Sequence, residues 1–255
     1  MAIYHLSVKT ISRAKGRSVT ASAAYRSAEK IKDLRTGKTF DYSKKKGVLH
    51  SELLLPENAP SWNRSQLWNE AEKSETRKNS TVAREFVIAL PSELSEDQRK
   101  ELAQDLTKEL VKRHGFAADL CIHEPNKEGD DRNHHAHILC STRKLEPTGF
   151  TAKTRELDGG YKEVEYWRER FAEIQNKHLE RAGIDSRVDH RSLKDQGIDR
   201  EPTRHKGVAV TGIERRTGEI SLIGAKFEML DLAKRAREEI QKEMEQQRQI
   251  ELERQ

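Results

Sequence analysis

Apolar residues in this chain follow two spacings, and each spacing predicts a local structure. Strict alternation with polar residues indicates a strand with one buried face, whereas recurrence every three or four positions indicates an amphipathic helix. We expect strands at residues 2–9, 38–42, 82–90, 118–123 and 133–142. We expect helices at residues 19–31, 58–78, 95–114, 163–182, and from about residue 222 to the end.

The clearest of these helices is residues 95–114. Ser95 is a residue type that accepts a hydrogen bond from the first helical turn, and Gly115 is the type that most readily ends a helix in the left-handed conformation. Between them, Leu102, Leu106 and Leu110 recur on one face. Both ends and the buried face of this helix are therefore defined by sequence.

The order of these elements predicts the fold class. Hairpins mixed with long crossovers indicate an α+β fold with an antiparallel-dominated central sheet and helices packed on one face. We expect a domain over residues 1–220 and a charged helical C-terminal extension over 221–255. Residues 221–255 could equally be the start of a longer helical region.

Composition narrows the class of protein. Hydrophobic residues make up 34% and charged residues 36%, enough for one core with solvated helices around it. No run approaches the roughly 20 apolar residues that span a bilayer, so we expect no membrane segment. The N-terminus has the pattern of a strand and not of a signal peptide, which makes the cytoplasm the expected location. Cys121 and Cys140 form no Cys-x-x-Cys pair and fall on opposite strand faces, which argues against a thiolate zinc site and a disulfide.

Positive charge is concentrated at the N-terminus. Residues 1–50 hold 12 Lys and Arg against 3 Asp and Glu, a net charge of +9, while the whole chain carries +5. Residues 44–47 add a loop of three lysines and a glycine to this block. A local basic block indicates a phosphate-bearing partner, although a solvated basic face is an equally good interpretation of charge alone.

Three histidines predict a metal site. His135 and His137 are two apart on a strand and so share a face. His123 lies opposite the apolar parity of its own strand, so the three imidazoles should stand on one side of the sheet. We expect a divalent metal ion with open positions, Mg or Mn in use, with Zn, Co or Ni also able to occupy the site. Glu124, Asp130 and Asp131 are near enough in sequence to orient the imidazoles.

A nucleophile is suggested by Tyr25, which falls on the short helix inside the basic block. A phenol attacks a phosphate at neutral pH only with help from a metal ion or a nearby base. The alternative is a buried aromatic ring that anchors an alanine-rich helix, and the residues alone leave both interpretations open.

Three stretches together resemble the MobA/MobL family of plasmid mobilisation relaxases, within the HUH endonucleases. They are residues 3–27, residues 84–91, and His123 with residues 133–138; residues 201–207 add a further resemblance. His134 departs from the pattern, since many relatives carry proline there, but it is not a ligand position.

The resemblance implies a role for each matched residue. Tyr25 would attack a scissile phosphate in one DNA strand at a transfer origin, giving a 5′-phosphotyrosine link that can be rejoined. His123, His135 and His137 would bind the metal, and Glu85 would orient a histidine or accept the tyrosine proton. Single-stranded or hairpin DNA, accessory mobilisation proteins and a type IV secretion coupling protein are the implied partners.

Basic residues from both halves of the chain are candidates for holding the DNA backbone. They are Arg13, Lys15, Arg17, Arg26, Arg191 and Arg204.

Two other functions stay open. A rolling-circle replication initiator shares the histidine pair and the tyrosine chemistry, but such initiators generally place the tyrosine after the histidines. A metal-stabilised single-stranded DNA-binding module without catalysis is the alternative from another class, and Tyr25→Phe separates it from a nicking enzyme.

Overall fold

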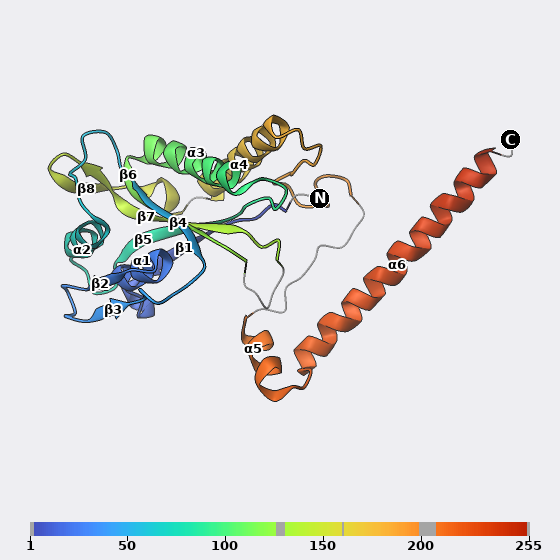
Figure 1. Cartoon of the computed structure of the whole chain (residues 1–255), viewed down its shortest axis with the longest axis horizontal. Helices are drawn as coiled ribbons and strands as arrows, with labels where there is room; N and C mark the ends of the chain where they lie inside the picture. The colour runs from blue at the N-terminus through green and yellow to red at the C-terminus, as the bar shows by residue number, and fades with distance from the viewer. Residues whose placement is uncertain (1–2, 126–130, 160, 199–207, 254–255) are drawn as a thin grey trace. The chain divides into compact units, whose positions relative to one another are not determined.

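An antiparallel sheet organises the N-terminal part of the chain (Figure 1). The computed structural model describes residues 3–125, 131–159, 161–198 and 208–253. The strand order is β1-β5-β7-β6-β4, with β8 paired to β7, and each pairing in this sheet is antiparallel. The strands are β1 (Leu6–Ser12), β4 (Val48–Leu54), β5 (Thr81–Ala89), β6 (Phe116–His123), β7 (His135–Glu146) and β8 (Gly149–Lys153).

Four helices and a small hairpin accompany this sheet. The helices are α1 (Val19–Ser27), α2 (Arg64–Ser74), α3 (Glu96–His114) and α4 (Tyr161–Arg181), with short 3-10 turns at Arg13–Lys15 and Arg155–Leu157. Strands β2 (Lys30–Lys32) and β3 (Thr39–Asp41) form the hairpin. The predicted α+β fold with an antiparallel sheet is confirmed.

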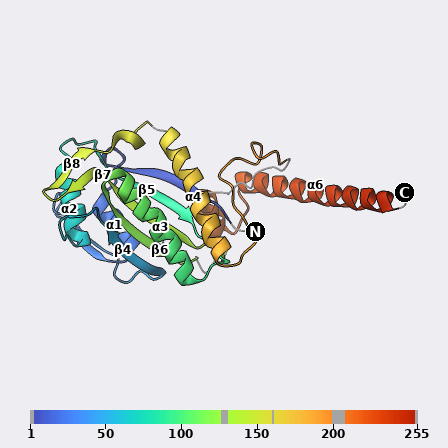
Figure 2. The ribbon, with the colours of Figure 1, turned by 90° about the horizontal axis from the view of Figure 1, so that it is seen from above.

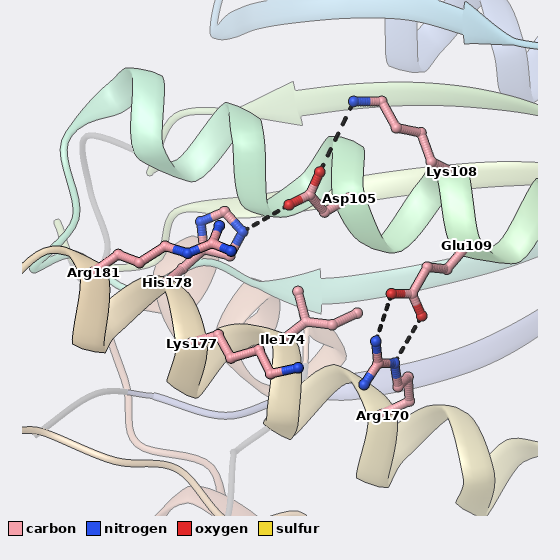
Figure 3. A pocket seen from close by; sticks show the side chains of 8 residues that line it. All are labelled: Asp105, Lys108, Glu109, Arg170, Ile174, Lys177, His178 and Arg181. Atoms are coloured by element: carbon pink, nitrogen blue, oxygen red, sulfur yellow. Dashed lines mark hydrogen bonds and ion pairs between the residues drawn. The ribbon is translucent and has the colours of Figure 1, made fainter.

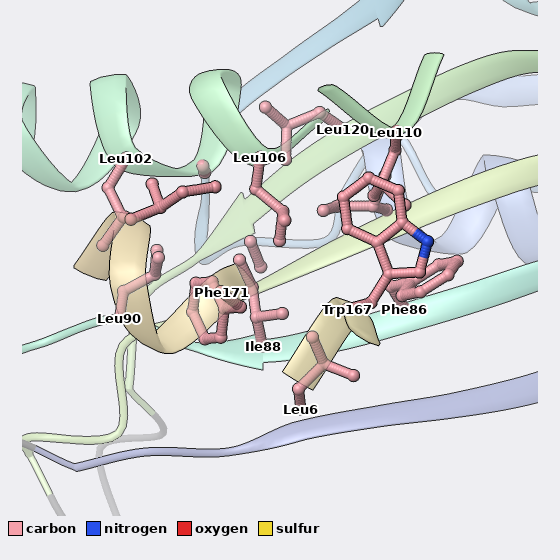
Figure 4. Packing of buried hydrophobic residues seen from close by; sticks show 14 of the residues in the cluster. Leu6, Phe86, Ile88, Leu90, Leu102, Leu106, Leu110, Leu120, Trp167 and Phe171 are labelled. Atoms are coloured by element: carbon pink, nitrogen blue, oxygen red, sulfur yellow. The ribbon is translucent and has the colours of Figure 1, made fainter. Parts of the chain in front are cut away.

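Helices α3 and α4 cover one face of the sheet (Figure 2). Leucines of α3 meet Phe86 and Ile88 of β5, and Trp167 and Phe171 of α4 close the core (Figure 4). Helix α3 begins and ends as predicted, with Ser95 and Gln98 forming a capping box and Gly115 in the left-handed conformation at φ 68°. Burial of this apolar layer is the main source of stability for the domain.

The opposite face carries α1 and α2, so helices lie on both sides of the sheet and the expectation of helices on one face is wrong. Val19, Ala23, Leu67 and Trp68 are fully buried in this second cluster. The buried carboxylate of Asp119 on β6 accepts hydrogen bonds from Trp68 Nε1, at 2.9 Å, and from Arg64. This polar contact fixes α2 beside the strand that ends at His123.

The observed elements differ from the sequence pattern at several places. The helix predicted over 19–31 ends at Ser27 and strand β2 follows it, and helix α5 was not predicted. Edge strand β4 and strand β8 were not predicted, because short half-polar runs give weak alternation. The predicted helix 58–78 is shorter, since Asn63 caps α2 in a capping box and the chain before it is not helical.

A groove lies between α3 and α4 on the surface (Figure 3). Arg170 donates to both oxygens of Glu109 at 2.7 Å. His178 and Asp105 are joined at 3.0 Å across the same groove. We call this feature the α3–α4 groove.

The chain separates into two compact units, residues 1–190 and 191–255. The second unit contains α5 (Val208–Thr217) and the long charged helix α6 (Leu222–Glu253), which was expected as the C-terminal extension. The second unit begins at residue 191, earlier than the predicted division at residue 220. The predicted domain over residues 1–220 stays a prediction. Among the described residues, no helix combines the length and the apolar character needed to cross a membrane.

Candidate metal centre and tyrosine site

The three predicted histidines come together where β6 ends and β7 begins. His123 pairs directly with His135 across the two strands, and His137 pairs with Cys121. The ring centroids are 4.9 to 5.5 Å apart. One ligand atom from each histidine lies within 4.8 Å of the others, and no other such cluster occurs in the described part of the chain.

Each imidazole has one nitrogen engaged by an oxygen of the protein. His123 Nε2 donates to the carbonyl of Arg26 at 2.8 Å, and His135 Nδ1 donates to the carbonyl of Asn133 at 2.9 Å. His137 Nδ1 donates to Glu85 Oε1 at 2.6 Å. A neutral imidazole that donates through one nitrogen offers a lone pair on the other. His123 Nδ1 and the Nε2 atoms of His135 and His137 are therefore the candidate ligand atoms.

Burial favours the neutral form of two of the three imidazoles, His123 and His135. Burial lowers the pKa of His123 to about 4, and the positive charge of Lys45 acts in the same direction against the hydrogen bond to Arg26. Burial also lowers the pKa of His135. Metal ions bind the unprotonated ring, so these two ligands need no deprotonation at neutral pH. The donor set fits a divalent cation.

Glu85 orients His137 from strand β5. The residue is 3% exposed, which excludes the solvent-facing position that a strand glutamate can also take. Burial raises its pKa, but hydrogen bonds from His137 and Arg26 outweigh burial and lower it to about 2. A carboxylate held in this way fixes the ring orientation of a metal-binding histidine.

The imidazole partners expected from sequence proximity are not the observed ones. Of the three acidic residues considered, Asp130 lies outside the described residues. The observed hydrogen bonds go instead to Glu85, Arg26 and Asn133. Strand pairing explains this difference, because β5 lies beside β7 and brings Glu85 to His137 from far away in sequence.

Tyr25 lies on the exposed side of α1 and is 49% accessible. The helix packs through Ala23 and Ala24 instead, so an anchoring role for the phenol ring in the core is excluded. The next residue, Arg26, accepts a hydrogen bond from His123 through its carbonyl and forms an ion pair with Glu85 through its side chain. The backbone that carries Tyr25 is thus joined directly to the histidine cluster.

Arg13 does not project toward solvent. Its guanidinium pairs with Glu72 at 2.6 Å and donates to the carbonyl of Glu75 at 2.8 Å, and its side chain is 9% exposed. This contact ties the turn after β1 to α2. We therefore remove Arg13 from the candidate DNA contacts.

The other candidate DNA contacts have different surroundings. Lys15 and Arg17 are exposed, and Arg17 donates to the carbonyl of Thr10 at 3.3 Å. Arg26 is engaged by Glu85, as described above. Arg191 is an exposed residue of the second unit, and Arg204 lies outside the described residues.

Two residues beside Tyr25 were not singled out by sequence. The Tyr42 ring meets the Tyr25 ring edge-on, with centroids 5.2 Å apart, and Lys45 Nζ lies 4.3 Å from the Tyr25 centroid. Lys45 belongs to the predicted basic loop, but nothing in that run of lysines distinguishes it from its neighbours.

Solved structures with a similar overall fold define the class of fold. The metal-bound conjugative relaxase TrwC in complex with oriT DNA has a TM-score of 0.51, covering 87% of this chain and 88% of that one at 10% identity. A structure from work on the molecular basis of vancomycin resistance transfer in Staphylococcus aureus has a TM-score of 0.67 at 41% identity, covering 75% of this chain and all of that one. The fold is that of a relaxase domain.

The chain belongs to the MobA/MobL family, and the model of this family matches residues 17–216. It is 41% identical to the mobilization protein MobL of Acidithiobacillus ferridurans, covering 94% of this chain and 71% of that protein. Conjugal transfer protein TraA of Rhizobium radiobacter is 36% identical over 85% of this chain, which spans only 22% of TraA. The predicted family is confirmed.

Proposed function

We propose that this chain is a DNA relaxase that nicks one strand at a plasmid transfer origin and can rejoin it. The observation that carries the proposal is the direct connection between the tyrosine helix and the histidine cluster. The exposed Tyr25 directly precedes Arg26, whose carbonyl accepts a hydrogen bond from His123. In this proposal, one phosphate contacts both the phenol and a metal ion held by the histidines.

The proposed reaction is a transesterification. Tyr25 Oη attacks the phosphorus, the new Oη–P bond forms, and the bond from phosphorus to the 3′ oxygen breaks. The phenol proton is released, and the departing 3′ oxygen takes up a proton. The phosphotyrosine ester retains the energy of the broken linkage, so attack by the 3′-hydroxyl restores the strand.

Metal dependence is part of the proposal. A divalent ion bound by His123, His135 and His137 would polarise the scissile phosphate and offset charge that develops on it. Mg or Mn is the proposed working ion, and Zn, Co and Ni suit the same imidazoles. We assign Glu85 to the orientation of His137, because a carboxyl group with a pKa of about 2 is a weak base.

The proposed substrate is single-stranded or hairpin DNA at the origin. TrwC is a conjugative relaxase solved in complex with oriT DNA, and family membership extends this substrate class to the chain as a proposal. Lys15, Arg17, Arg191 and Arg204 are the proposed backbone contacts, and Arg204 lies outside the described residues. Accessory mobilisation proteins, a type IV secretion coupling protein and a cytoplasmic location complete the proposal.

The test is a denaturing gel of labelled single-stranded DNA fragments that tile the region upstream of the coding sequence. With Mn²⁺, the wild-type chain should convert one fragment into a covalent protein–DNA adduct and a shorter product with a free 3′-hydroxyl. Chelation of the metal and Tyr25→Phe should each remove the adduct, while Tyr25→Phe leaves binding intact. Adducts that persist in Tyr25→Phe would show that another residue attacks. Binding without cleavage by the wild-type chain on every fragment would favour the non-catalytic module.

A further inference from the structure

The loop that carries Lys45 joins the tyrosine helix to the histidine cluster. At its start, Tyr42 N donates to the carbonyl of Glu29, just after α1, at 3.1 Å. At its end, Glu124 N donates to the carbonyl of Gly47 at 3.0 Å, beside the pairing of Val48 with His123. The loop is therefore fixed at both ends to the elements that present Tyr25 and His123.

The turn inside this loop sets the position of Lys45. Lys45 N donates to the Tyr42 carbonyl at 2.8 Å, which closes a four-residue turn. Asp41 stabilises the start of the turn, since its carboxylate accepts from the backbone and hydroxyl of Ser43 at 3.1 and 2.7 Å. Tyr42 and Lys45 therefore project from one rigid turn toward the same neighbour.

That neighbour is the Tyr25 ring. Lys45 Nζ lies 4.3 Å from its centroid, within the range of a cation–π contact. The Tyr42 ring approaches edge-on, at 89° and 5.2 Å between centroids. These two contacts limit the directions that an otherwise exposed phenol can take.

Lys45 also contributes positive charge to the histidine cluster. Its charge helps lower the pKa values of His123 and His135, so the ammonium group lies within electrostatic reach of both rings. Within the described ranges, no carboxylate forms an ion pair with Lys45, although the side chain is half-buried. A half-buried cation that contacts the phenol ring and acts electrostatically on His123 and His135 is complementary to an anion placed beside these groups.

We propose that Lys45 is a positioning residue for Tyr25 and a ligand of the scissile phosphate. Its ammonium group holds the phenol ring for in-line attack and donates a hydrogen bond to a non-bridging phosphate oxygen. This inference rests on the proposed function and adds a residue to the same site. No proton or bond is exchanged at Lys45: the Oη–P bond forms and the P–O3′ bond breaks as above, while Lys45 offsets the negative charge that grows on phosphorus oxygens.

The neighbouring lysines supply a matched control. Lys44 and Lys46 flank Lys45 in the same loop and carry the same charge, but both are exposed. Removal of either should weaken attraction of DNA through general electrostatics alone. A role specific to position 45 must therefore appear as a difference between Lys45→Met and Lys46→Met.

The experiment measures single-turnover adduct formation and DNA affinity on the fragment that the wild-type chain cleaves. At saturating DNA, Lys45→Met should slow adduct formation by about 100-fold, in the range found when one donor to a developing oxyanion is removed. Lys46→Met should slow it by less than about threefold, and both variants should bind the uncleaved fragment with similar affinity. Lys45→Arg should recover most of the rate, because it keeps a cation over the ring.

Three outcomes overturn the inference. Equal rates for Lys45→Met and Lys46→Met, a loss confined to DNA affinity, or no recovery in Lys45→Arg would each contradict it. Melting temperatures of the variants guard against misfolding, and Lys45→Gln, which keeps a polar side chain, replaces Lys45→Met if that variant unfolds. The two proposals fail in different ways: binding without cleavage by the wild-type chain on every fragment overturns the proposed function, whereas a normal rate in Lys45→Met removes only Lys45.

Discussion

Two sides of the same sheet each carry a histidine bonded to a carboxylate, with different consequences. In the α3–α4 groove, His178 and Asp105 are joined at 3.0 Å, while on the opposite side His137 and Glu85 are joined at 2.6 Å. Asp105 also lies 3.9 Å from Lys108, and the neighbouring Arg170 is neutralised by Glu109. The groove is a set of surface ion pairs between two helices.

The histidine cluster has the same pair but a different neighbourhood. Two further imidazoles converge on His137, each held by a backbone carbonyl and not by a carboxylate. One ligand atom of each imidazole lies within 4.8 Å of the other two. A histidine–carboxylate pair therefore becomes a candidate metal site only where strand pairing brings other imidazoles beside it.

Loss of one histidine should give the largest difference in metal affinity between the histidine cluster and the α3–α4 groove. Since removal of an outer partner typically costs 10–100-fold in metal affinity, His135→Ala should cost more, about 1000-fold. His178→Ala should leave metal affinity unchanged. Calorimetric titration with Mn²⁺ and Ni²⁺ measures both. Equal affinities for the two variants would remove the distinction between the sides.

A core substitution should show that the α3 side provides stability and not chemistry. Leu106 is fully buried between α3 and the sheet. Leu106→Ala should lower the free energy of unfolding by about 2–5 kcal/mol through the cavity it leaves. Urea unfolding measures the loss, and metal affinity of the folded fraction should not change. A lower affinity at full folding would mean that the core also sets the geometry of the histidines.

The two carboxylates should differ when each is made neutral. Glu85→Gln removes the charge that holds His137 and should weaken metal binding by about 10–100-fold. Asp105→Asn makes the same change beside His178 and should leave metal binding intact. The same titration compares the two variants, and an unaffected Glu85→Gln would contradict the orienting role of Glu85.

Acid should lower the free energy of unfolding, because burial lowers the pKa of His123 in the folded chain. The pKa of His123 falls to about 4 in the folded chain, so the unfolded chain binds more protons between about pH 6.5 and 4. Stability of the metal-free protein is complete above about pH 6.5 and is lost as the pH falls toward 4, by about 1–2 kcal/mol between pH 7 and 5. Urea unfolding at both pH values measures this loss. His123→Gln should reduce it, and an unchanged loss in that variant would show that other groups are responsible.

The sequence predicted those features that depend on local spacing. Residue parity placed His123, His135 and His137 on one face, and cap residues defined α3 at both ends. Features that depend on long-range contacts were missed. Arg13 has a partner, Glu72, far along the chain, so its basic charge suggested DNA where the structure has an ion pair.

Lys45 is a second residue whose surroundings the sequence did not predict. Three consecutive lysines have one pattern in sequence, and only the turn closed by Tyr42 selects the middle one for contact with Tyr25. Strand β4, which ends this loop, was also missed because an edge strand with mixed polarity gives little periodic signal. Local pattern thus predicted the histidine cluster, while tertiary packing determined what surrounds the phenol.

The central claim is that the phenol of Tyr25 and the three histidines act on one phosphorus atom. Mass spectrometry of the trypsin-digested adduct tests it most directly, because cleavage after Arg17 and Arg26 isolates Tyr25 as the one tyrosine of its peptide, residues 18–26. We predict that this peptide carries the nucleotide on Tyr25, and that the adduct is lost in His135→Ala. Attachment at another residue, such as Tyr42, or an undiminished adduct in His135→Ala would contradict the account.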